Sequence, residues 1–513
     1  MAIKSNHLKR LIVGVMLVCF SLVVGVVGGV KIASINKETT TDDKTHIEQL
    51  FDILSENWYS EIYYGKEADE DLLIHQFIGA LSTNQSQMLD PYTYLIKNES
   101  GQSGVVAGKI GITMNYFYNY PIITEVHKDG PAYNKILKGD IIVQTGKVVD
   151  QTMYKYSIVD EGVDFSTIVN YALGKPGEEI YIKVARFVDN KLTFQEFTLQ
   201  LASNLNNPYS SLVEESFDDT LMVKLTGFVD SSKGSDTCKE LENILKKDNS
   251  KNIIIDLRDN GGGSLSSVVN VCDLFLPKDY LVTTLCYKDG TTTPYYTKDD
   301  TCYNYDNIII FQNEKTASAS EIMISTLQYY LNDKVTLIGG KTYGKGIAQL
   351  TTKVFGGAYS LQYTCARWLR PDNSWIGMSG SMFTENYQLG FDPSNNYLIS
   401  KNDLLNLMES SNSYIFYKDN ARFAAYKYDN VHSANKYFFM VYNKLFNKSI
   451  RTDYYFDLTS KEAIKNYQKL KDTNLKDGNM NEETFLYFVN DFYNEKEAYL
   501  NQYFEKAKLI IGE

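Results

Sequence analysis

Two serines near the middle of the chain stand where a hydroxyl group could act as a nucleophile. The segment Thr316-Ala-Ser-Ala-Ser-Glu321 lies where a predicted strand gives way to a helix. A hydroxyl there faces the positive end of the helix dipole and unpaired N–H groups, which favour a developing oxyanion. Serine also caps helices very often. This segment alone therefore favours a capping role over a nucleophile.

A serine nucleophile needs a base, and the surrounding region contains no histidine. The chain has five: His7, His46, His75, His127 and His432. A lysine held neutral by burial is an alternative base. Lys345 stands in Thr-Tyr-Gly-Lys-Gly-Ile-Ala-Gln, where flanking glycines would let its side chain turn inward. Its pKa would have to fall from about 10.4 to ~7–8, whereas most lone lysines are solvated surface charges.

A run of glycines follows another predicted strand. Asn260-Gly-Gly-Gly263 comes directly after Ile-Ile-Ile-Asp-Leu-Arg-Asp, and glycine lets backbone N–H groups approach a substrate closely. The simpler alternative is an ordinary strand-to-helix turn. A phosphate-binding loop is not supported, because no Gly-Lys-Ser/Thr follows.

Together these segments resemble the C-terminal processing peptidases, also called tail-specific proteases. That family carries Leu-Arg-x-Asn followed by glycines, then Ser-Ala-Ser-Glu, then Phe/Tyr-Gly-Lys-Gly-x-x-Gln. The matching segments here are residues 257–263, 318–321 and 343–349. The resemblance implies a serine endopeptidase that needs no metal or organic cofactor.

The resemblance also implies roles for individual residues. Ser318 would be the nucleophile, Lys345 the general base, and Gln349 the residue that orients the lysine. Ser320 would be a structural neighbour or a cap. The implied oxyanion-hole donors are the backbone N–H groups of Ala319 and of Gly262 or Gly263.

The resemblance extends over about residues 45–395 and includes a peptide-binding domain. Residues 89–95 (Leu-Asp-Pro-Tyr-Thr-Tyr-Leu) are like the N-terminal signature of the family, and residues 108–142 look like a PDZ domain. A PDZ domain adds a peptide as an edge strand and holds its terminal carboxylate with backbone amides. The implied partners are proteins or peptides with exposed C-terminal tails. The implied peptide-binding residues are Lys109, Ile110, Gly111 and Ile112.

The elements that must position these residues follow from the apolar pattern. Helices are expected at 44–58 and 71–81, and strands at 110–114, 122–126, 140–144 and 180–186. Between residues 206 and 395 strands alternate with helices, which predicts an α/β layer architecture. Its expected strands are 252–257, 307–311 and 335–338, and its expected helices are 265–275 and 321–331.

The N-terminus contains a candidate membrane span. Residues 11–30 carry no charge, and a helix of that length spans about 30 Å, the thickness of a bilayer core. Lys4, Lys9 and Arg10 precede it, so the N-terminus is expected in the cytoplasm and the catalytic part outside it. The predicted protein is a single-pass cell-membrane protein. A cleaved signal peptide is the alternative.

We therefore expect a multidomain chain of mixed α+β and α/β class. The expected order is a cytoplasmic tail (1–10), a transmembrane signal anchor (11–30), a helical N-terminal region (31–97), a PDZ-like domain (98–205), a Ser-Lys peptidase core with a crotonase-like α/β fold (206–395) and a mostly helical C-terminal module (396–513). Residues 455–513 are similar to small helical peptidoglycan-binding repeats. An ordinary amphipathic helical extension explains them equally well.

Composition narrows the remaining possibilities. The net charge is −12 over 513 residues, so the chain lacks the basic footprint of a nucleic-acid binder. Its six cysteines form no Cys-x-x-Cys pair, which gives no support to a zinc ribbon or a thioredoxin-type site. Cys286 and Cys302 flank a turn-rich stretch and could form a bridge. Two competing functions remain: a catalytically silent PDZ-type scaffold and a crotonase-like acyl-CoA enzyme.

Overall fold

The structure is a computed structural model of the whole chain. It describes residues 45–59, 92–97, 109–117, 120–149, 152–157, 173–202, 211–213, 219–231, 236–300, 302–357, 359–376, 390–401, 442–446, 448, 458–479 and 481–512. The chain divides into two compact units. Unit 1 comprises Met1–Gln102, Tyr209–Ile399 and Lys506–Glu513, and unit 2 comprises Ser103–Pro208 and Ser400–Glu505.

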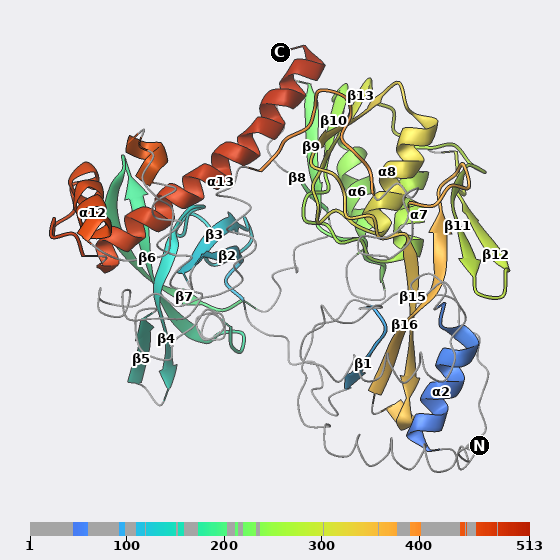
Figure 1. Cartoon of the computed structure of the whole chain (residues 1–513), viewed down its shortest axis with the longest axis horizontal. Coiled ribbons are helices and arrows are strands. Elements are labelled where there is room, and N and C mark those ends of the chain that lie inside the picture. The colour runs from blue at the N-terminus through green and yellow to red at the C-terminus, as the bar shows by residue number, and fades with distance from the viewer. Residues whose placement is uncertain are drawn as a thin grey trace. The chain divides into compact units, whose positions relative to one another are not determined.

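The core of unit 1 is a five-stranded sheet in the order β14-β13-β10-β9-β8 (Figure 1). Its strands are β8 (Ser211–Val213), β9 (Thr220–Leu225), β10 (Asn252–Asp256), β13 (Asn307–Gln312) and β14 (Val335–Gly339). All neighbours are parallel except β8 and β9. Strand β10 is buried along its whole length, as its unbroken isoleucine run predicts for a central parallel strand.

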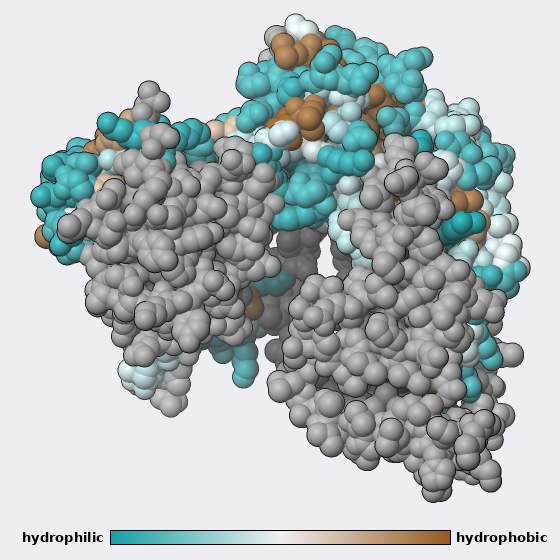
Figure 2. Space-filling model, in the orientation of Figure 1, coloured by the Kyte–Doolittle hydropathy of each residue, from teal (hydrophilic) through white to brown (hydrophobic). Residues whose placement is uncertain are grey.

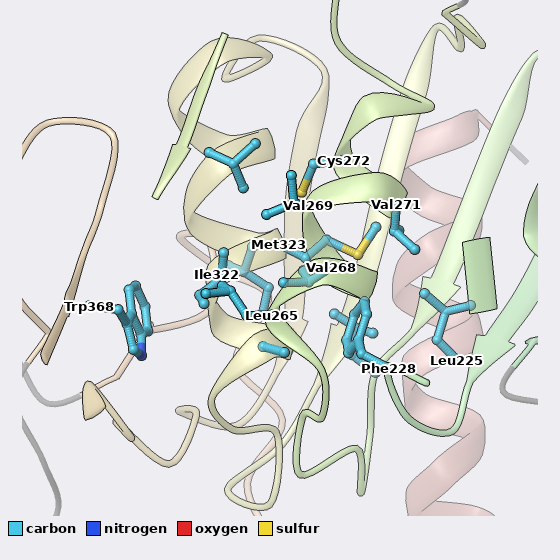
Figure 3. Packing of buried hydrophobic residues seen from close by; sticks show 14 of the residues in the cluster. Leu225, Phe228, Leu265, Val268, Val269, Val271, Cys272, Ile322, Met323 and Trp368 are labelled. Atoms are coloured by element: carbon cyan, nitrogen blue, oxygen red, sulfur yellow. The ribbon is translucent and has the colours of Figure 1, made fainter. Parts of the chain in front are cut away.

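Three helices accompany this sheet: α6 (Thr237–Leu245), α7 (Leu265–Asp273) and α8 (Ala319–Tyr330). Side chains cap the first two, because Asp236 accepts a hydrogen bond from the Lys239 N–H and Ser264 accepts one from the Ser267 N–H. In Figure 3, α7 and α8 lie next to each other, with Val268 and Met323 in the layer between them. Both of these side chains are fully buried.

A second, antiparallel sheet completes unit 1, in the order β1-β16-β11-β12 with β15 paired to β16. Its strands are β1 (Tyr94–Lys97), β11 (Leu281–Tyr287), β12 (Thr292–Tyr296), β15 (Ile347–Val354) and β16 (Tyr359–Leu369). Helix α8 contacts this sheet as well, since the Thr326 hydroxyl donates to the Val282 carbonyl at 2.9 Å. The pairing of β1 with β16 brings the N-terminal segment into unit 1, to which α2 (His46–Asn57) also belongs.

Unit 2 contains a six-stranded antiparallel sheet in the order β2-β3-β4-β6-β7, with β5 paired to β4. Its strands are β2 (Ile112–Phe117), β3 (Tyr120–Val126), β4 (Ile141–Val149), β5 (Thr152–Ser157), β6 (Glu179–Val188) and β7 (Lys191–Gln200). Residues of α12 (Leu458–Lys471) and α13 (Glu482–Ile511) share one hydrophobic core with this sheet. The rings of Tyr120 and Phe485 lie 5.3 Å apart in it. The segments 103–208 and 400–505 therefore pack as one body.

The expected strands and helices within the described residues are present with small shifts at their ends. The expected helix at 71–81 and the candidate span at 11–30 lie outside the described residues. Within the part of the chain that the structure describes, no helix has the length and apolar character needed to cross a membrane. On the face shown in Figure 2, the described surface is mainly hydrophilic, with a few apolar patches.

The bridge considered between Cys286 and Cys302 is not formed. The five described cysteines are all free thiols. The residue opposite Cys286 is Thr292, at the start of β12. Cys302 follows the end of that strand, so it does not lie opposite Cys286 in the hairpin. Burial raises the pKa of the Cys302 thiol, with a further contribution from Asp300.

Candidate active site

Ser318 stands at the turn between β13 and α8 in an unusual backbone conformation. Its φ is 58° and its ψ is −116°. Non-glycine residues rarely adopt positive φ, and such strain persists where the surrounding structure enforces it, often at functional sites. The carbonyl of Asn260 anchors the turn, since it accepts the Ala317 N–H at 3.0 Å and the buried Ser320 hydroxyl at 3.0 Å. Ser320 therefore has a structural partner inside the protein.

The glycine run approaches this turn closely. Gly262 has φ +101°, and a Cβ placed on it would lie 2.7 Å from the Ala317 carbonyl oxygen and 2.8 Å from the Ala319 nitrogen. Only glycine fits there without a shift of the backbone. Asn260 fixes the run from within, because its fully buried amide donates to the Leu225 carbonyl and accepts the Gly262 N–H at 2.9 Å.

The two glycines named as oxyanion-hole donors differ in the direction of their N–H groups. The N–H of Gly262 is directed to the Asn260 side chain. Gly263 forms a parallel bridge with Phe228. The Phe228 N–H donates to the Gly262 carbonyl, and the Phe228 carbonyl accepts the Ser264 N–H. In that pattern the N–H of Gly263 itself points away from Phe228. Gly263 and Ala319 both line the cavity that contains Ser318.

Lys345 lies on the segment that connects β14 to β15, and its backbone is held on both sides. Its N–H donates to Glu321 Oε2 at 2.9 Å, and its carbonyl accepts the Trp368 indole N–H at 2.8 Å. The next carbonyl, of Gly346, accepts the indole N–H of Trp375 at 2.7 Å. The Gly346 carbonyl also accepts the backbone N–H of Trp368 in β16 at 3.1 Å. Buried backbone groups rarely remain unpaired, and here two tryptophan side chains add to the backbone pairing of the segment.

The side chain of Lys345 meets a neutral acceptor. Its Nζ donates to Gln349 Oε1 at 2.7 Å, and the Gln349 amide nitrogen donates to the Tyr92 carbonyl at 2.7 Å. The centroid of the Tyr92 ring lies 4.6 Å from the same Nζ. The Gln349 amide is neutral, so it stabilises an ammonium less than a carboxylate in its place would.

Glu321 connects the serine turn to the lysine segment. Its side chain is fully buried and accepts four hydrogen bonds. The donors are the Ser318 N–H (2.8 Å), the Thr342 hydroxyl (2.6 Å), the Gly344 N–H (2.7 Å) and the Lys345 N–H (2.9 Å). Burial raises the pKa of the Glu321 carboxyl above its ordinary value, and the four hydrogen bonds act in the opposite direction.

A cavity of about 440 Å³ contains these groups. Ser318, Lys345 and Gln349 all line it, so the structure brings together the three residues expected to carry the chemistry. Asp230 adds a carboxylate to the lining. The apolar part of the lining includes Leu265, Leu285, Ile322, Ile347 and Trp368. Figure 3 shows Leu265, Ile322 and Trp368 in this region of unit 1.

Sequence reasoning missed four residues that position the lysine segment. The Ser-Ala-Ser-Glu motif includes Glu321 but does not indicate its role. The four hydrogen bonds that its carboxylate accepts are visible only in the folded structure. Tyr92 lies in the N-terminal signature, far from Lys345 along the chain. Trp368 and Trp375 have no spacing that relates them to Lys345. A scan for aromatic residues could not have separated them from ordinary core residues.

The residues expected to bind a peptide carboxylate lie in unit 2, at the start of β2. Lys109 and Ala202 exchange two backbone hydrogen bonds, which ties one end of this loop to the chain after β7. Gly111 has φ +79°, and a Cβ there would lie 2.7 Å from the Cα of Gly130. Ile110 is buried, and Ile112 pairs with Val126. Strand β2 ends the strand order of its sheet in the described part of the chain.

Comparison with known proteins agrees with the geometry of unit 1. Residues 219–382 match the family model described as "Peptidase family S41". The chain carries a family S41 peptidase domain. It is a serine-type peptidase. Within the described residues no group of three or more His, Cys, Asp or Glu side chains could hold a metal ion.

Curated relatives extend the match beyond the peptidase domain. The chain is 29% identical over 395 residues to a "Probable CtpA-like serine protease" of Staphylococcus aureus strain N315, covering 74% of this chain and 72% of the relative. A protein of the same description from Staphylococcus haemolyticus is 28% identical over 384 residues, covering 72% and 70%. Among solved structures, a photosystem II D1 C-terminal processing protease has a TM-score of 0.36 at 15% identity, covering 68% of this chain and 91% of that one.

Proposed function

We propose that this S41 peptidase cleaves peptide bonds with a Ser-Lys dyad, with Ser318 as the nucleophile and Lys345 as the base. The observation that carries the proposal is the shared cavity, in which Ser318 and Lys345 are held by one buried carboxylate, that of Glu321. The hydrogen bond from Lys345 Nζ to Gln349 supports a role for the glutamine in orienting the amine. No histidine is among the described residues that line this cavity.

In the proposed reaction, Lys345 accepts the Ser318 hydroxyl proton while Oγ bonds to the carbonyl carbon of the substrate. The resulting oxyanion is stabilised by the N–H groups of Ala319 and Gly263. The lysine ammonium then gives its proton to the leaving nitrogen as the C–N bond breaks, which leaves an ester on Ser318. Water attacks this ester with Lys345 again as the base, and the carboxylate product and free Ser318 are released.

Three variants test the dyad. Ser318→Ala removes the nucleophile, and Lys345→Arg keeps the charge but removes the base because arginine stays protonated. Both are expected to lose about 10²–10⁴-fold in kcat/KM on an unstructured protein substrate such as casein. The matched control is Lys341→Arg, at an exposed lysine of the same segment, which should stay within about two-fold. Near-normal cleavage by Lys345→Arg would show that the base lies elsewhere.

The competing function is a catalytically silent peptide-binding scaffold. A fluorophosphonate probe reacts with an activated serine but not with an ordinary helix cap. Labelling of the native chain that disappears in Ser318→Ala supports the peptidase. Absence of labelling and of casein cleavage by the native chain supports the scaffold.

We also propose that the PDZ-like part of unit 2 recruits substrates by their C-terminal tails. The edge position of β2 and the loop Lys109–Ile112 at its start support this, because such domains pair a peptide with an edge strand. Peptides with a free C-terminal carboxylate should be cut several-fold faster than the same peptides with an amidated C-terminus. Equal kcat/KM values for the two forms would remove this loop from substrate capture.

Membrane anchoring through residues 11–30 is part of the same proposal, with the peptidase outside the cytoplasm. The uncharged run and the preceding basic residues support it. Fractionation of cells that express the full chain should recover the protein in the membrane and leave it accessible to external protease. Release into the medium without residues 1–30 would support the cleaved signal peptide instead.

Peptidoglycan binding by the C-terminal residues remains a second, separate proposal. The glutamine of the repeat-like motif, Gln468, is fully buried and binds the Asn479 carbonyl, the Thr484 hydroxyl and the Gly478 N–H. These bonds hold the loop between α12 and α13, so a structural role explains the motif equally well. Co-sedimentation of the purified chain with peptidoglycan sacculi separates the two roles.

A further inference from the structure

Tyr92 reaches the catalytic lysine from a segment far away in the sequence. It stands just before β1, whose antiparallel pairing places Leu95 opposite Leu361 of β16. Strand β16 also pairs with β15, the strand that follows Lys345. The sheet therefore brings the N-terminal signature beside the lysine segment.

Three parts of Tyr92 contact this segment. Its carbonyl accepts the Gln349 amide N–H at 2.7 Å. Its ring centroid lies 4.6 Å from Lys345 Nζ. Its hydroxyl lies 2.5 Å from the hydroxyl of Tyr343, two residues before the lysine.

We propose that Tyr92 is a positioning residue for the lysine base, holding Gln349 and the amine of Lys345 in one arrangement. The inference rests on the proposed role of Lys345. A glutamine amide has one accepting and one donating end. Because a backbone carbonyl can only accept, the nitrogen of Gln349 must face Tyr92, and its oxygen then faces Lys345.

The ring of Tyr92 acts on the amine directly. An aromatic face attracts an ammonium at this distance, and a half-buried ring also limits the positions that the lysine side chain can occupy. Among the described residues, the titratable groups beside the lysine segment include Glu321, which bonds the Lys345 backbone, Tyr343, Asp230 in the cavity lining, and the ion pair of Lys341 with Asp392. Loss of the ring therefore removes a specific attraction for the charged form of the amine.

The test compares Tyr92→Leu with Tyr92→Phe in the full chain. Tyr92→Leu keeps the carbonyl and an apolar side chain but loses the ring, so kcat should fall by about 10²-fold with KM within about two-fold. The acidic limb of the pH profile of kcat/KM should move to lower pH by about 0.5–1 unit, because the ammonium loses its aromatic partner. Tyr92→Phe keeps the ring and loses one hydroxyl contact, and should recover kcat to within about five-fold of the native value.

Tyr59→Leu is the matched control. Tyr59 packs against the same residue, Ile347, as Tyr92 does. Tyr59→Leu should lower the midpoint of thermal unfolding by a similar amount, and the acidic limb of the pH profile of kcat/KM should stay in place. If Tyr92→Leu melts well below this control, Tyr92→Met, whose longer unbranched side chain reaches further into the space of the ring, provides the same measurements.

Each outcome separates the inference from the dyad. If Lys345→Arg is inactive and Tyr92→Leu has a native kcat and pH limb, the inference is wrong and the dyad stands. If Tyr92→Leu and Tyr59→Leu lose kcat equally with unchanged limbs, the role of Tyr92 is only structural, which also overturns it. If Lys345→Arg is active, the dyad fails and the inference fails with it.

Discussion

The backbone N–H groups of Ser318 and Lys345 donate to the same carboxylate oxygen, Oε2 of Glu321, at 2.8 and 2.9 Å. The two residues are far apart in the chain, and a shared acceptor fixes the distance between the turn of one and the segment of the other. The second oxygen, Oε1, accepts the Thr342 hydroxyl and the Gly344 N–H. Both oxygens therefore receive two hydrogen bonds each.

Glu321→Gln should destabilise the protein and lower kcat. The amide NH₂ group of glutamine would replace an oxygen that accepts two hydrogen bonds. Two buried hydrogen-bond donors would then face another donor and lose their acceptor. We expect a loss of about 2–4 kcal/mol in the free energy of unfolding, measured from urea unfolding followed by fluorescence. Glu314→Gln, at an exposed glutamate of the preceding loop, is the control and should change the midpoint little. Equal midpoints for the two variants would show that the buried carboxylate is not needed.

The raised pKa of Glu321 also predicts the pH dependence of stability. A carboxyl whose folded pKa lies above its unfolded value contributes stability that is fully present below the unfolded value, about 4.5. That contribution is lost as the pH rises through the folded pKa. The free energy of unfolding of the native chain should therefore fall over this window relative to that of Glu321→Gln, which cannot ionise at this position. A constant difference between the two chains across the window would contradict the shift.

The residues of the candidate site could be predicted from the sequence, but the contacts that hold them in place could not. Ser318, Lys345 and Gln349 fall within short motifs, and the strand before the serine turn, β13, has a strong pattern in its isoleucine run. The supporting contacts depend on strand pairing between distant segments. Tyr92 reaches Gln349 only because β1 pairs with β16, and no local pattern contains that register.

The packing of the C-terminal region shows the same limit. Its helices could be predicted from amphipathic spacing, but the sheet against which they pack could not. Phe485 packs on Tyr120, and the Lys138 amine bonds the Glu497 carboxylate at 2.8 Å, so the helices belong to the core of unit 2. Apolar spacing shows that a face is buried without showing what covers it.

Gly262→Ala should lower activity strongly, whereas Gly261→Ala should change it little. A Cβ at Gly262 would lie 2.7–2.8 Å from atoms of the serine turn, and its φ of +101° is strained for any other residue. At Gly261 a Cβ would meet nothing within 4 Å. We expect at least about a 10²-fold fall in kcat for Gly262→Ala and a change within about three-fold for Gly261→Ala. Comparable activity in both variants would show that the close approach is not required.

Gln349→Glu should move the acidic limb of kcat/KM to higher pH. A carboxylate beside Lys345 Nζ stabilises the ammonium, so the amine becomes a neutral base only at higher pH. The expected shift is about 1–3 units, read from rates on one peptide between pH 6 and about 10. Gln349→Leu is the control: it removes both hydrogen bonds without adding charge, so kcat should fall without an upward movement of the limb. An unmoved limb in Gln349→Glu would mean that Lys345 is not the group that titrates.

The apolar lining of the cavity predicts the side chain preferred next to the cleaved bond. Burying a leucine-sized side chain rather than an amide of similar size is worth about 1.5–3 kcal/mol, so Leu peptides should exceed Asn peptides by about 10- to 100-fold in kcat/KM. Ile322 lines the cavity, whereas Ile324 is buried on the same helix away from the lining. Ile322→Ala should shift the preference from Leu toward the larger Phe. Ile324→Ala should lower stability comparably and leave the Phe/Leu ratio unchanged, and equal ratios in both variants would place the side-chain subsite elsewhere.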